Sequence, residues 1–151
     1  MIINSLIAVS GGFDPLHWGH VKMIAEASRY GPVMVILNSD AWLKRKKGYV
    51  FMSWRERACI MGNIKGVSIV TAVDDSDDTV TEALKRHHPT YFANGGDRKE
   101  TNTPEMDVCN ELSIEMLWNI GGEKDQSSSA LVNKARWEKR EICDSLFMGE
   151  E

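Results

Sequence analysis

The rest of the chain can be interpreted from one segment, Gly11-Gly12-Phe13-Asp14-Pro15-Leu16-His17-Trp18-Gly19-His20. An apolar run at residues 6–9 precedes it and a helical pattern follows it, so we expect a turn from a first strand into a first helix. Glycines let the backbone approach an anion, and the unpaired N–H groups of a helix start point toward it. The two imidazoles, three residues apart, add donors on one face. We therefore predict a phosphate-binding turn that contains Gly11, Gly12, Phe13, His17 and His20.

The length and composition are those of an ordinary globular chain. Its 151 residues, 42% of them hydrophobic and 26% charged, suffice for a buried core, and we expect residues 1–151 to form a single domain. The net charge of −4 disfavours a general nucleic-acid-binding protein, which usually carries a basic face. No apolar run approaches the roughly 18–20 residues of a membrane span, and the first residues lack the features of a signal peptide. We therefore expect a cytoplasmic protein that binds neither nucleic acid nor a membrane.

Residues that commonly bind metals are not arranged as a metal site in the sequence. Cys59, Cys109 and Cys143 are odd in number and far apart, and they form no Cys-x-x-Cys pair. The acidic run at residues 74–78 precedes a predicted helix, where carboxylates favour the positive end of the helix dipole. We predict reduced thiols and no metal held by the protein itself.

Strands and helices alternate along the chain. Residues 33–37 form a continuous apolar run, which is typical of a strand that is covered on both faces. Four more strands are predicted at residues 5–10, 67–73, 90–93 and 113–118. Helices are predicted at residues 18–30, 53–64, 79–87, 105–111 and 130–146, and Asn38-Ser39-Asp40 is expected to cap a further short helical segment before residue 44. This order predicts an α/β fold, a Rossmann-like three-layer α/β/α sandwich with a five-stranded parallel sheet.

A basic loop at residues 44–47 follows the second predicted strand. It reads Lys-Arg-Lys-Lys, and runs of this kind are often only a solvated surface. Here Arg55 and Arg57 lie on the next helix, and the loop leaves the same edge of the sheet as the histidines. This convergence of positive charge in an acidic protein favours an anion site. We predict that Lys44 or Lys47 contacts phosphate, with help from Arg57.

Two polar segments complete the candidate site. Ser127, Ser128 and Ser129 begin the last helix after a glycine-rich loop. One hydroxyl suffices to cap a helix, whereas three hydroxyls beside unpaired N–H groups also suit the far end of a triphosphate. Asn94, Gly95, Gly96 and Asp97 follow the fourth strand, either as a simple turn or as a flat backbone surface for a base. We predict nucleotide contacts from both segments.

Together, these segments resemble the cytidylyltransferase-like nucleotidyltransferase family over nearly the full chain. Residues 12–20 are very similar to the first motif of glycerol-3-phosphate cytidylyltransferases. Residues 38–48, 56–57 and 94–97 look closer to the heptose 1-phosphate adenylyltransferase domain. The three serines fit the Ser-Thr-Thr segment of the family.

The resemblance implies roles for individual residues. His17, His20 and a lysine, either Lys44 or Lys47, would contact the phosphates. The hydroxyls of Ser128 and Ser129 would hold the β and γ phosphates, and Gly96 would border the base.

Two departures from the family pattern concern the acceptor. Glycerol-phosphate enzymes carry an arginine shortly before the serine/threonine segment, whereas the matching residue here is Gly122, with Lys124 nearby. Residues 98–107 are also unusually polar and long for that turn. The sequence therefore leaves open both the acceptor and the choice between CTP and ATP.

The expected function is transfer of CMP or AMP from CTP or ATP to a small phosphorylated polyol or sugar, with release of pyrophosphate. Mg²⁺, held largely by the nucleoside triphosphate, would offset its charge. An acceptor phosphate with a second pKa of about 6 is already ionised at neutral pH and needs no general base. Relatives suggest a homodimer. The alternatives are a non-catalytic nucleotide sensor of the same fold and a structural protein.

Overall fold

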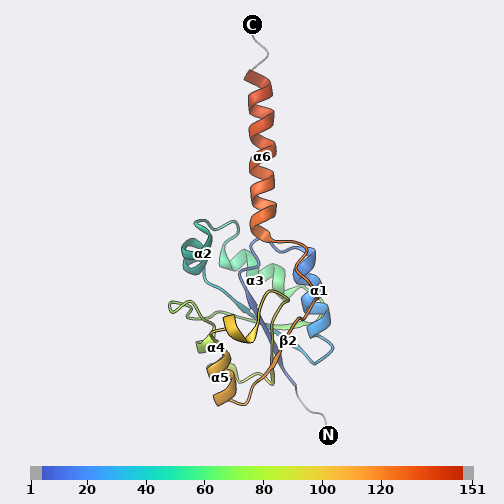
Figure 1. Cartoon of the computed structure of the whole chain (residues 1–151), viewed down its shortest axis with the longest axis vertical. Helices are drawn as coiled ribbons and strands as arrows, with labels where there is room; N and C mark the ends of the chain where they lie inside the picture. The colour runs from blue at the N-terminus through green and yellow to red at the C-terminus, as the bar shows by residue number, and fades with distance from the viewer. Residues whose placement is uncertain (1–4, 148–151) are drawn as a thin grey trace.

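The structure is a single parallel β-sheet with helices on both faces (Figure 1). This computed structural model describes residues 5–147, and the side chains of residues 5–139. The strands are β1 (Ile7–Gly11), β2 (Val33–Leu37), β3 (Val67–Thr71), β4 (Tyr91–Ala93) and β5 (Glu115–Leu117). They pair in parallel in the order β3-β2-β1-β4-β5. The predicted Rossmann-like α/β fold with a five-stranded parallel sheet is confirmed.

Between residues 5 and 147 the chain forms six α-helices and one short 3₁₀ turn. The helices are α1 (Trp18–Ala27), α2 (Asp40–Lys47), α3 (Trp54–Gly62), α4 (Thr81–His87), α5 (Met106–Glu111) and α6 (Ser128–Phe147), and the turn is η1 (Glu100–Asn102). Figure 1 shows α6 extending away from the rest of the molecule. None of the helices in this part of the chain is both long enough and apolar enough to cross a membrane.

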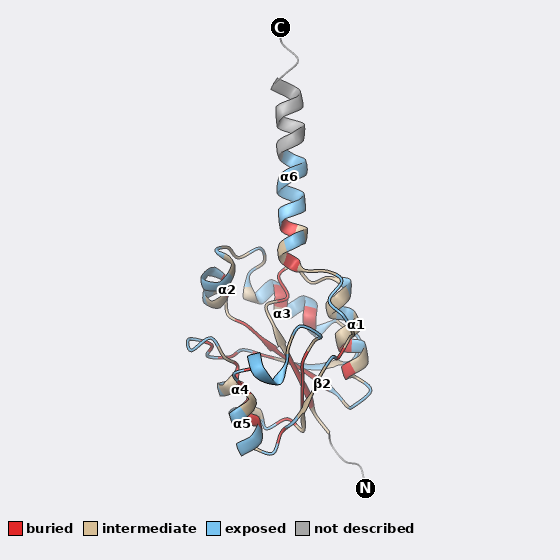
Figure 2. Ribbon diagram, in the orientation of Figure 1, coloured by how far each residue is buried: buried red, intermediate tan, exposed pale blue. Residues whose placement is uncertain are grey.

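Alternate residues of the strands face two separate layers of helices. Ile7 and Val9 of β1 pack with residues of α1 and α3, whereas Ala8 packs with residues of α4 and α5. Strand β2 lies between β3 and β1, and all five of its residues are fully buried, as expected for a strand covered on both faces. Figure 2 shows this buried centre beneath the exposed outer faces of the helices. The arrangement is the predicted three-layer sandwich.

The strand order reverses next to β1. The chain passes from β1 to β2 and β3 on one side, and then returns to β4 on the other side of β1. In open α/β sheets such a reversal leaves a crevice at the carboxyl ends of the two strands, where ligands bind. Gly11 ends β1 and Asn94 directly follows β4, so two of the predicted segments meet at this point.

Helix α2 differs from the prediction of a basic loop. Residues 44–47 form the last turns of this helix. Ser39 caps its start by accepting a hydrogen bond from the Trp42 N–H, and Gly48 ends it with a φ of 81°. Cations near the C-terminus of a helix interact favourably with its dipole. This interaction explains why the helix extends over the basic residues. The helix also directs the four side chains to different sides.

Candidate active site

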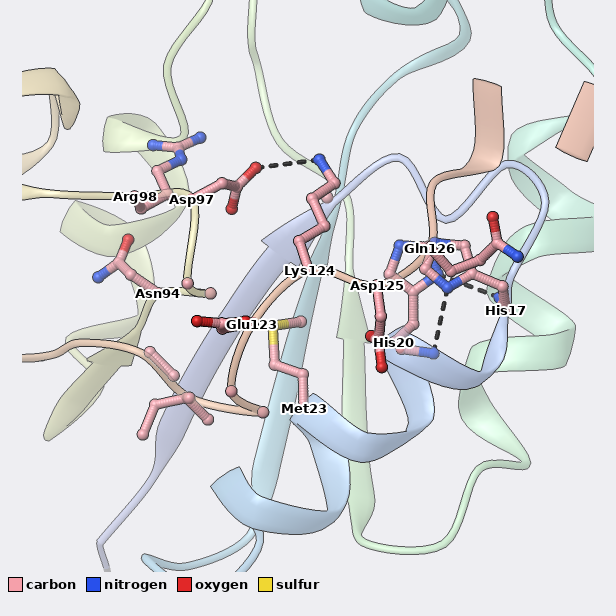
Figure 3. Close-up of a pocket in the computed structure, with 18 of the residues that line it drawn as sticks. His17, His20, Met23, Asn94, Asp97, Arg98, Glu123, Lys124, Asp125 and Gln126 are labelled. Atoms are coloured by element: carbon pink, nitrogen blue, oxygen red, sulfur yellow. Dashed lines mark hydrogen bonds and ion pairs between the residues drawn. The ribbon is translucent and has the colours of Figure 1, made fainter. Parts of the chain in front are cut away.

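A pocket of about 290 Å³ lies at the carboxyl ends of β1 and β4 (Figure 3). Three connections line it: the signature turn (residues 11–20), the β4 turn (residues 94–98) and the α6 loop (residues 119–126). The predicted site residues in its lining are Gly11, His17, His20, Asn94, Gly95, Gly96 and Asp97. The other predicted residues lie outside this lining, and they are Gly12, Phe13, Lys44, Lys47, Arg57, Ser127, Ser128 and Ser129.

His17 and His20 are held by the backbone at the start of α1. His17 Nδ1 accepts a hydrogen bond from the Gly19 N–H at 3.1 Å, one of the N–H groups that a helix start leaves unpaired. His20 Nδ1 in turn accepts from the His17 N–H at 3.2 Å. The two rings stack with their centroids 3.7 Å apart. The sequence spacing predicted two imidazoles on one face, and the structure adds that they form a reciprocal helix cap.

These hydrogen bonds determine the tautomer of both imidazoles. A ring nitrogen that accepts from a backbone N–H carries no proton, so the proton of each neutral ring lies on Nε2. Both rings line the pocket. Each histidine therefore has one N–H donor, while its basic nitrogen is engaged by the helix.

Both rings are also kept neutral by their surroundings. Burial, with smaller contributions from the neighbouring His17, Lys47 and Lys124, lowers the pKa of His20 to about 3. Burial likewise lowers the pKa of His17, again with contributions from the two lysines. At neutral pH the pair thus consists of two uncharged donors. Preorganised donors of this kind suit an oxygen atom whose negative charge grows during a reaction.

The glycines and Phe13 give the signature turn its shape. A methyl group at Gly12 would come within 2.8 Å of Leu43 Cδ2, and one at Gly11 within 3.2 Å of the Phe13 ring. Phe13 is buried with a φ of 50°, and its ring packs edge-on against His20 at a centroid distance of 4.8 Å. Gly12 and Phe13 therefore maintain the shape of the turn by packing against Leu43 and His20. Their direct contact with a nucleotide stays a prediction.

Asp14 is an important residue of the turn to which the sequence analysis gave no role. Its carboxylate is fully buried and accepts hydrogen bonds from the Phe51 N–H at 2.7 Å and the Met52 N–H at 2.6 Å. These bonds tie the signature turn to the segment between α2 and α3. The Asp14 charge also raises the pKa of Lys47, although burial has the larger effect and lowers that pKa overall. The only signal in the sequence was its place inside the motif.

The structure gives Arg57 a different role from the predicted one. Its guanidinium is fully buried. It donates to four oxygens at 2.6–2.9 Å, which are the carbonyls of Met52, Gly12 and Asn38 and the carboxylate of Asp40. Because this engages most of its donors, the side chain is committed to holding three segments together beneath the turn. Its position does not support the prediction that it contacts phosphate.

Helical geometry separates the four cations of α2. Arg45 and Lys46 both form ion pairs with Asp78, at 3.2 and 3.3 Å. Lys44 is exposed. Lys47 is half-buried near the signature turn, where its charge lowers the pKa of both histidines. The structure therefore favours Lys47 over Lys44 as the lysine that faces a phosphate.

The two glycines of the β4 turn have different surroundings. A methyl group at Gly96 would come within 2.6 Å of the Gly122 carbonyl oxygen, so Gly96 allows the β4 turn to touch the α6 loop. A methyl group at Gly95 would meet no heavy atom closer than 3.4 Å. No contact within the protein therefore requires a glycine at position 95. A glycine there fits a backbone that a ligand approaches closely. Asn94 is buried, and its amide donates to the Leu117 carbonyl at 3.3 Å.

The serine segment joins α6 to the signature turn. Ser128 is buried, and its hydroxyl donates to the Pro15 carbonyl at 2.7 Å. Ser127 caps the helix, since its Oγ accepts from the Ala130 N–H at 3.1 Å. Gln126, directly before them, lines the pocket. The start of α6 therefore lies next to the pocket, and contact of the three serines with phosphate stays a prediction.

The α6 loop carries charged residues that the sequence analysis did not place in the site. Glu123, Lys124 and Asp125 all line the pocket. Lys124 forms an ion pair with Asp97 at 3.0 Å, and Asp125 forms one with Lys22 of α1 at 3.3 Å (Figure 3 shows the first). Lys124 was noted in the sequence only as a cation near the position of the family's arginine, and no motif marks Glu123 or Asp125. The available signal was that they follow the last strand of a parallel sheet.

Among the side chains that the structure describes, no group of three or more His, Cys, Asp or Glu residues is arranged to hold a metal ion. Cys59 and Cys109 are free thiols, and burial raises the pKa of Cys109 to about 11. The side chain of Cys143 lies outside the described residues.

Comparison with known proteins assigns this geometry to a family. The sequence model described as cytidylyltransferase-like matches residues 8–131, which run from β1 into α6 and include the whole pocket. The chain belongs to the cytidylyltransferase-like family. The resemblance predicted from the signature turn is confirmed.

Curated relatives of this cytidylyltransferase-like chain include bifunctional HldE proteins. HldE of Campylobacter jejuni subsp. jejuni serotype O:6 is 30% identical over 139 residues, which cover 90% of this chain and 29% of that protein. HldE of Campylobacter concisus is 33% identical over 114 residues, which cover 74% of this chain and 24% of that protein. The chain thus spans less than a third of the length of these relatives. The family and the relatives support nucleotidyltransferase activity in general.

Solved structures share the fold. The lipopolysaccharide core biosynthesis protein from Thermoplasma volcanium matches with a TM-score of 0.65 and 17% identity, over 80% of this chain and 98% of that chain. A protein of unknown function from Archaeoglobus fulgidus matches with a TM-score of 0.56 and 17% identity, over 74% of this chain and 87% of that chain. At this identity the likeness concerns the fold alone.

Proposed function

We propose that this cytidylyltransferase-like chain transfers a nucleoside monophosphate from CTP or ATP to a small phosphorylated polyol or sugar and releases pyrophosphate. The observation that carries the proposal is the pair of neutral imidazoles, whose protons lie on Nε2, in a pocket at the reversal point of the sheet. A solvated pair of histidines would not need the stacked, backbone-capped arrangement. Donors that are fixed in position can stabilise the charge that is redistributed on a phosphoryl group in the transition state.

The proposed reaction is an in-line displacement at the α-phosphorus. An oxygen of the acceptor phosphate forms the new P–O bond, while the bond from the α-phosphorus to the oxygen that bridges it to the β-phosphate breaks. The pyrophosphate leaves with the electron pair of that bond. Because the acceptor phosphate is ionised at neutral pH, no proton has to be removed before it attacks.

The chain's own residues would act by position and charge. His17 and His20 would donate from Nε2 to oxygens of the α-phosphoryl group, whose charge is redistributed in the transition state. Lys47, whose charge lowers the pKa of both histidines, would neutralise charge on the α and β groups. Arg57 and Asp14 would act indirectly, since they hold the signature turn in place. Catalysis is then mainly orientation of the two substrates.

Magnesium belongs to the substrate in this proposal. The Asp125 carboxylate is engaged by Lys22, Glu123 is exposed, and among the described side chains no three His, Cys, Asp or Glu residues are arranged to hold a metal ion. This donor set fits an ion that is held mainly by the phosphates, with few protein ligands. When bound, Mg²⁺ would supply charge neutralisation to the triphosphate.

The choice of the first acceptor to test is supported by relatives rather than by side chains. The signature turn resembles glycerol-phosphate enzymes, whereas other segments resemble the heptose 1-phosphate adenylyltransferase domain, and the curated relatives are HldE proteins. We therefore propose ATP with a sugar 1-phosphate as the first pair to test. CTP with glycerol 3-phosphate is the second.

A two-step experiment tests the proposal. A thermal-shift screen with ATP, CTP, GTP and UTP should show one preferred nucleotide, because a ligand that binds only the native state raises its stability. Pyrophosphate release is then measured with that nucleotide, with Mg²⁺, and with heptose 1-phosphate or glycerol 3-phosphate. Release that depends on an acceptor supports the proposal. A thermal shift without release for any acceptor would indicate a nucleotide sensor, and no shift at all would argue against both functions.

A further inference from the structure

The cations that line the pocket are both held in ion pairs. Arg98 lies 3.2 Å from Glu105, and Lys124 lies 3.0 Å from Asp97. The environments of these two pairs differ. Glu105 is only 2% exposed, and its second oxygen accepts a hydrogen bond from the Val80 N–H. The side chains of Lys124 and Asp97, in contrast, are 54% and 57% exposed.

This difference determines which cation can change partners. Removing Arg98 from Glu105 would leave a buried carboxylate without its cation, which is strongly unfavourable. Removing Lys124 from Asp97 leaves two groups that water can solvate, and exposed ion pairs contribute little to stability. Lys124 is therefore the lining cation that a ligand can recruit.

The charge of the pocket lining is a second reason to expect that an anionic ligand binds Lys124. The lining residues of the β4 turn and the α6 loop include three carboxylates, Asp97, Glu123 and Asp125, but only two cations. The histidines add no positive charge, because their pKa values are lowered. A polyphosphate that enters this lining needs a cation, and the Asp97 carboxylate competes with it for Lys124.

We propose that Lys124 binds a phosphate group of the nucleotide and that Asp97 is the partner it gives up when the nucleotide enters. This inference rests on the proposed function and assigns one of its phosphate-binding residues. The pair joins the β4 turn to the α6 loop, so the exchange also releases these two segments from one another.

The position of Lys124 supports this assignment. Figure 3 shows that the Lys124–Asp97 pair and the two histidines line the same pocket from different connections of the sheet. The charge of Lys124 lowers the pKa of both histidines and of Lys47, so these groups share one electrostatic field. Phosphates that contact the histidines would therefore lie within the reach of that field.

The test uses inorganic tripolyphosphate as the probe and isothermal titration calorimetry as the measurement. The variants are Lys124→Gln and Asp97→Asn in the full chain. The Lys46–Asp78 pair provides matched controls, because its side chains are similarly exposed, at 46% and 45%, and neither residue lines the pocket. Lys46→Gln and Asp78→Asn change the net charge by the same amounts. Thermal melting of every variant reports on folding.

The two pocket variants should change the affinity in opposite directions. Lys124→Gln should weaken tripolyphosphate binding by about tenfold, because a charge-assisted contact to phosphate is lost. Asp97→Asn should strengthen it by about threefold, because the competing carboxylate is removed. Both control variants should stay within about twofold of the parent chain, and Lys124→Arg should retain binding.

Two results would overturn the inference. If Lys124→Gln binds tripolyphosphate as well as the parent chain does, Lys124 is not a phosphate-binding residue. If Asp97→Asn weakens binding as much as Lys124→Gln does, the ion pair builds the site rather than competing with the ligand. Either result can occur in an enzyme with normal pyrophosphate release, so it would not by itself contradict the proposed function. Absence of both release and tripolyphosphate binding in the parent chain would overturn both proposals.

Discussion

The two sides of the pocket are held in different ways. The signature turn rests on fully buried charged groups, since Arg57 and Asp14 are both inaccessible to solvent and bind backbone groups of neighbouring segments. The β4 turn and the α6 loop are joined by the Lys124–Asp97 pair, which is more than half exposed on both sides. One side is fixed by the interior of the protein, and the other is held by contacts that water and ligands can replace.

This difference matches the tasks that we propose for each side. Donors to a reacting phosphoryl group must already be in place when charge develops on it. Groups that admit and release a substrate must instead exchange partners easily. In this pocket, the residues that would stabilise the reacting phosphoryl group rest on buried charges. The residues that would bind and release the ligand rest on exposed charges.

Substitution of the two pocket histidines tests the fixed side directly and should reduce activity most. His17→Asn and His20→Asn each remove the Nε2–H donor but keep a side-chain oxygen that can accept the cap hydrogen bond. We expect each to lower the rate of pyrophosphate release by a factor on the order of 10²–10³, the usual loss for one preorganised donor. His88→Asn, at the exposed C-cap of α4, is the control and should leave the rate unchanged. Normal turnover in either pocket variant would remove the proposed mechanism.

A second prediction concerns the support of that side. Arg57→Lys cannot reproduce the four hydrogen bonds of the guanidinium and should lower the free energy of unfolding by about 2–3 kcal/mol. Arg55→Lys, on the same helix but exposed, should change it by less than about 0.5 kcal/mol. Urea denaturation of both variants measures this difference. A loss of turnover in Arg57→Lys without a loss of stability would instead place Arg57 in contact with the substrate.

The choice between the two lysines of α2 gives a third, smaller effect. Lys47→Gln should reduce turnover by about tenfold, because it removes one cation that faces the phosphates. Lys44→Gln should change turnover by less than about twofold, because Lys44 is exposed whereas Lys47 is half-buried. Steady-state rates at saturating nucleotide separate the two. The reverse ranking would show that our placement of Lys47 at the site is wrong.

The smallest effect is on the pH dependence of stability. The pKa of His20 is lowered to about 3 in the folded protein, whereas an unfolded histidine titrates near pH 6.5. Between these values the unfolded chain binds more protons, so stability falls as the pH falls. From pH 7.5 to 5.5 this contribution is at most about 1.4 kcal/mol. Urea denaturation at both pH values should show a smaller pH effect in His20→Asn. An identical effect in both proteins would mean that His20 does not resist protonation.

The order of strands and helices could be predicted because its signals are local. Continuous apolar runs mark the buried strands, and glycine, proline and cap residues mark their ends. Boundaries were less certain, as for α1, which ends at Ala27 rather than near Tyr30. The basic run at residues 44–47 was wrongly predicted as a loop, although Ser39 and Gly48 in the sequence are ordinary signals for the ends of a helix.

Only those residues of the candidate site that belong to a sequence motif could be predicted. His17, His20 and Gly95 could be found because they lie in recognisable patterns at strand ends, and all three line the pocket. The role of Arg57 could not be predicted, because its acceptors come from three separate segments that meet only in the fold. The pairing of Lys124 with Asp97 joins residues far apart in the chain and likewise leaves no local signal.

The reciprocal cap at the start of α1 has a consequence for the kinds of molecule that this pocket can modify. The cap uses the lone pair of each imidazole, so neither ring can take up a proton unless the first turn of α1 opens. An alcohol or an amine would arrive at the phosphorus still carrying a proton that these rings cannot remove. The cap therefore suits an acceptor that is already anionic at neutral pH, such as a phosphate monoester, because the two imidazoles provide it with donors and not with a general base.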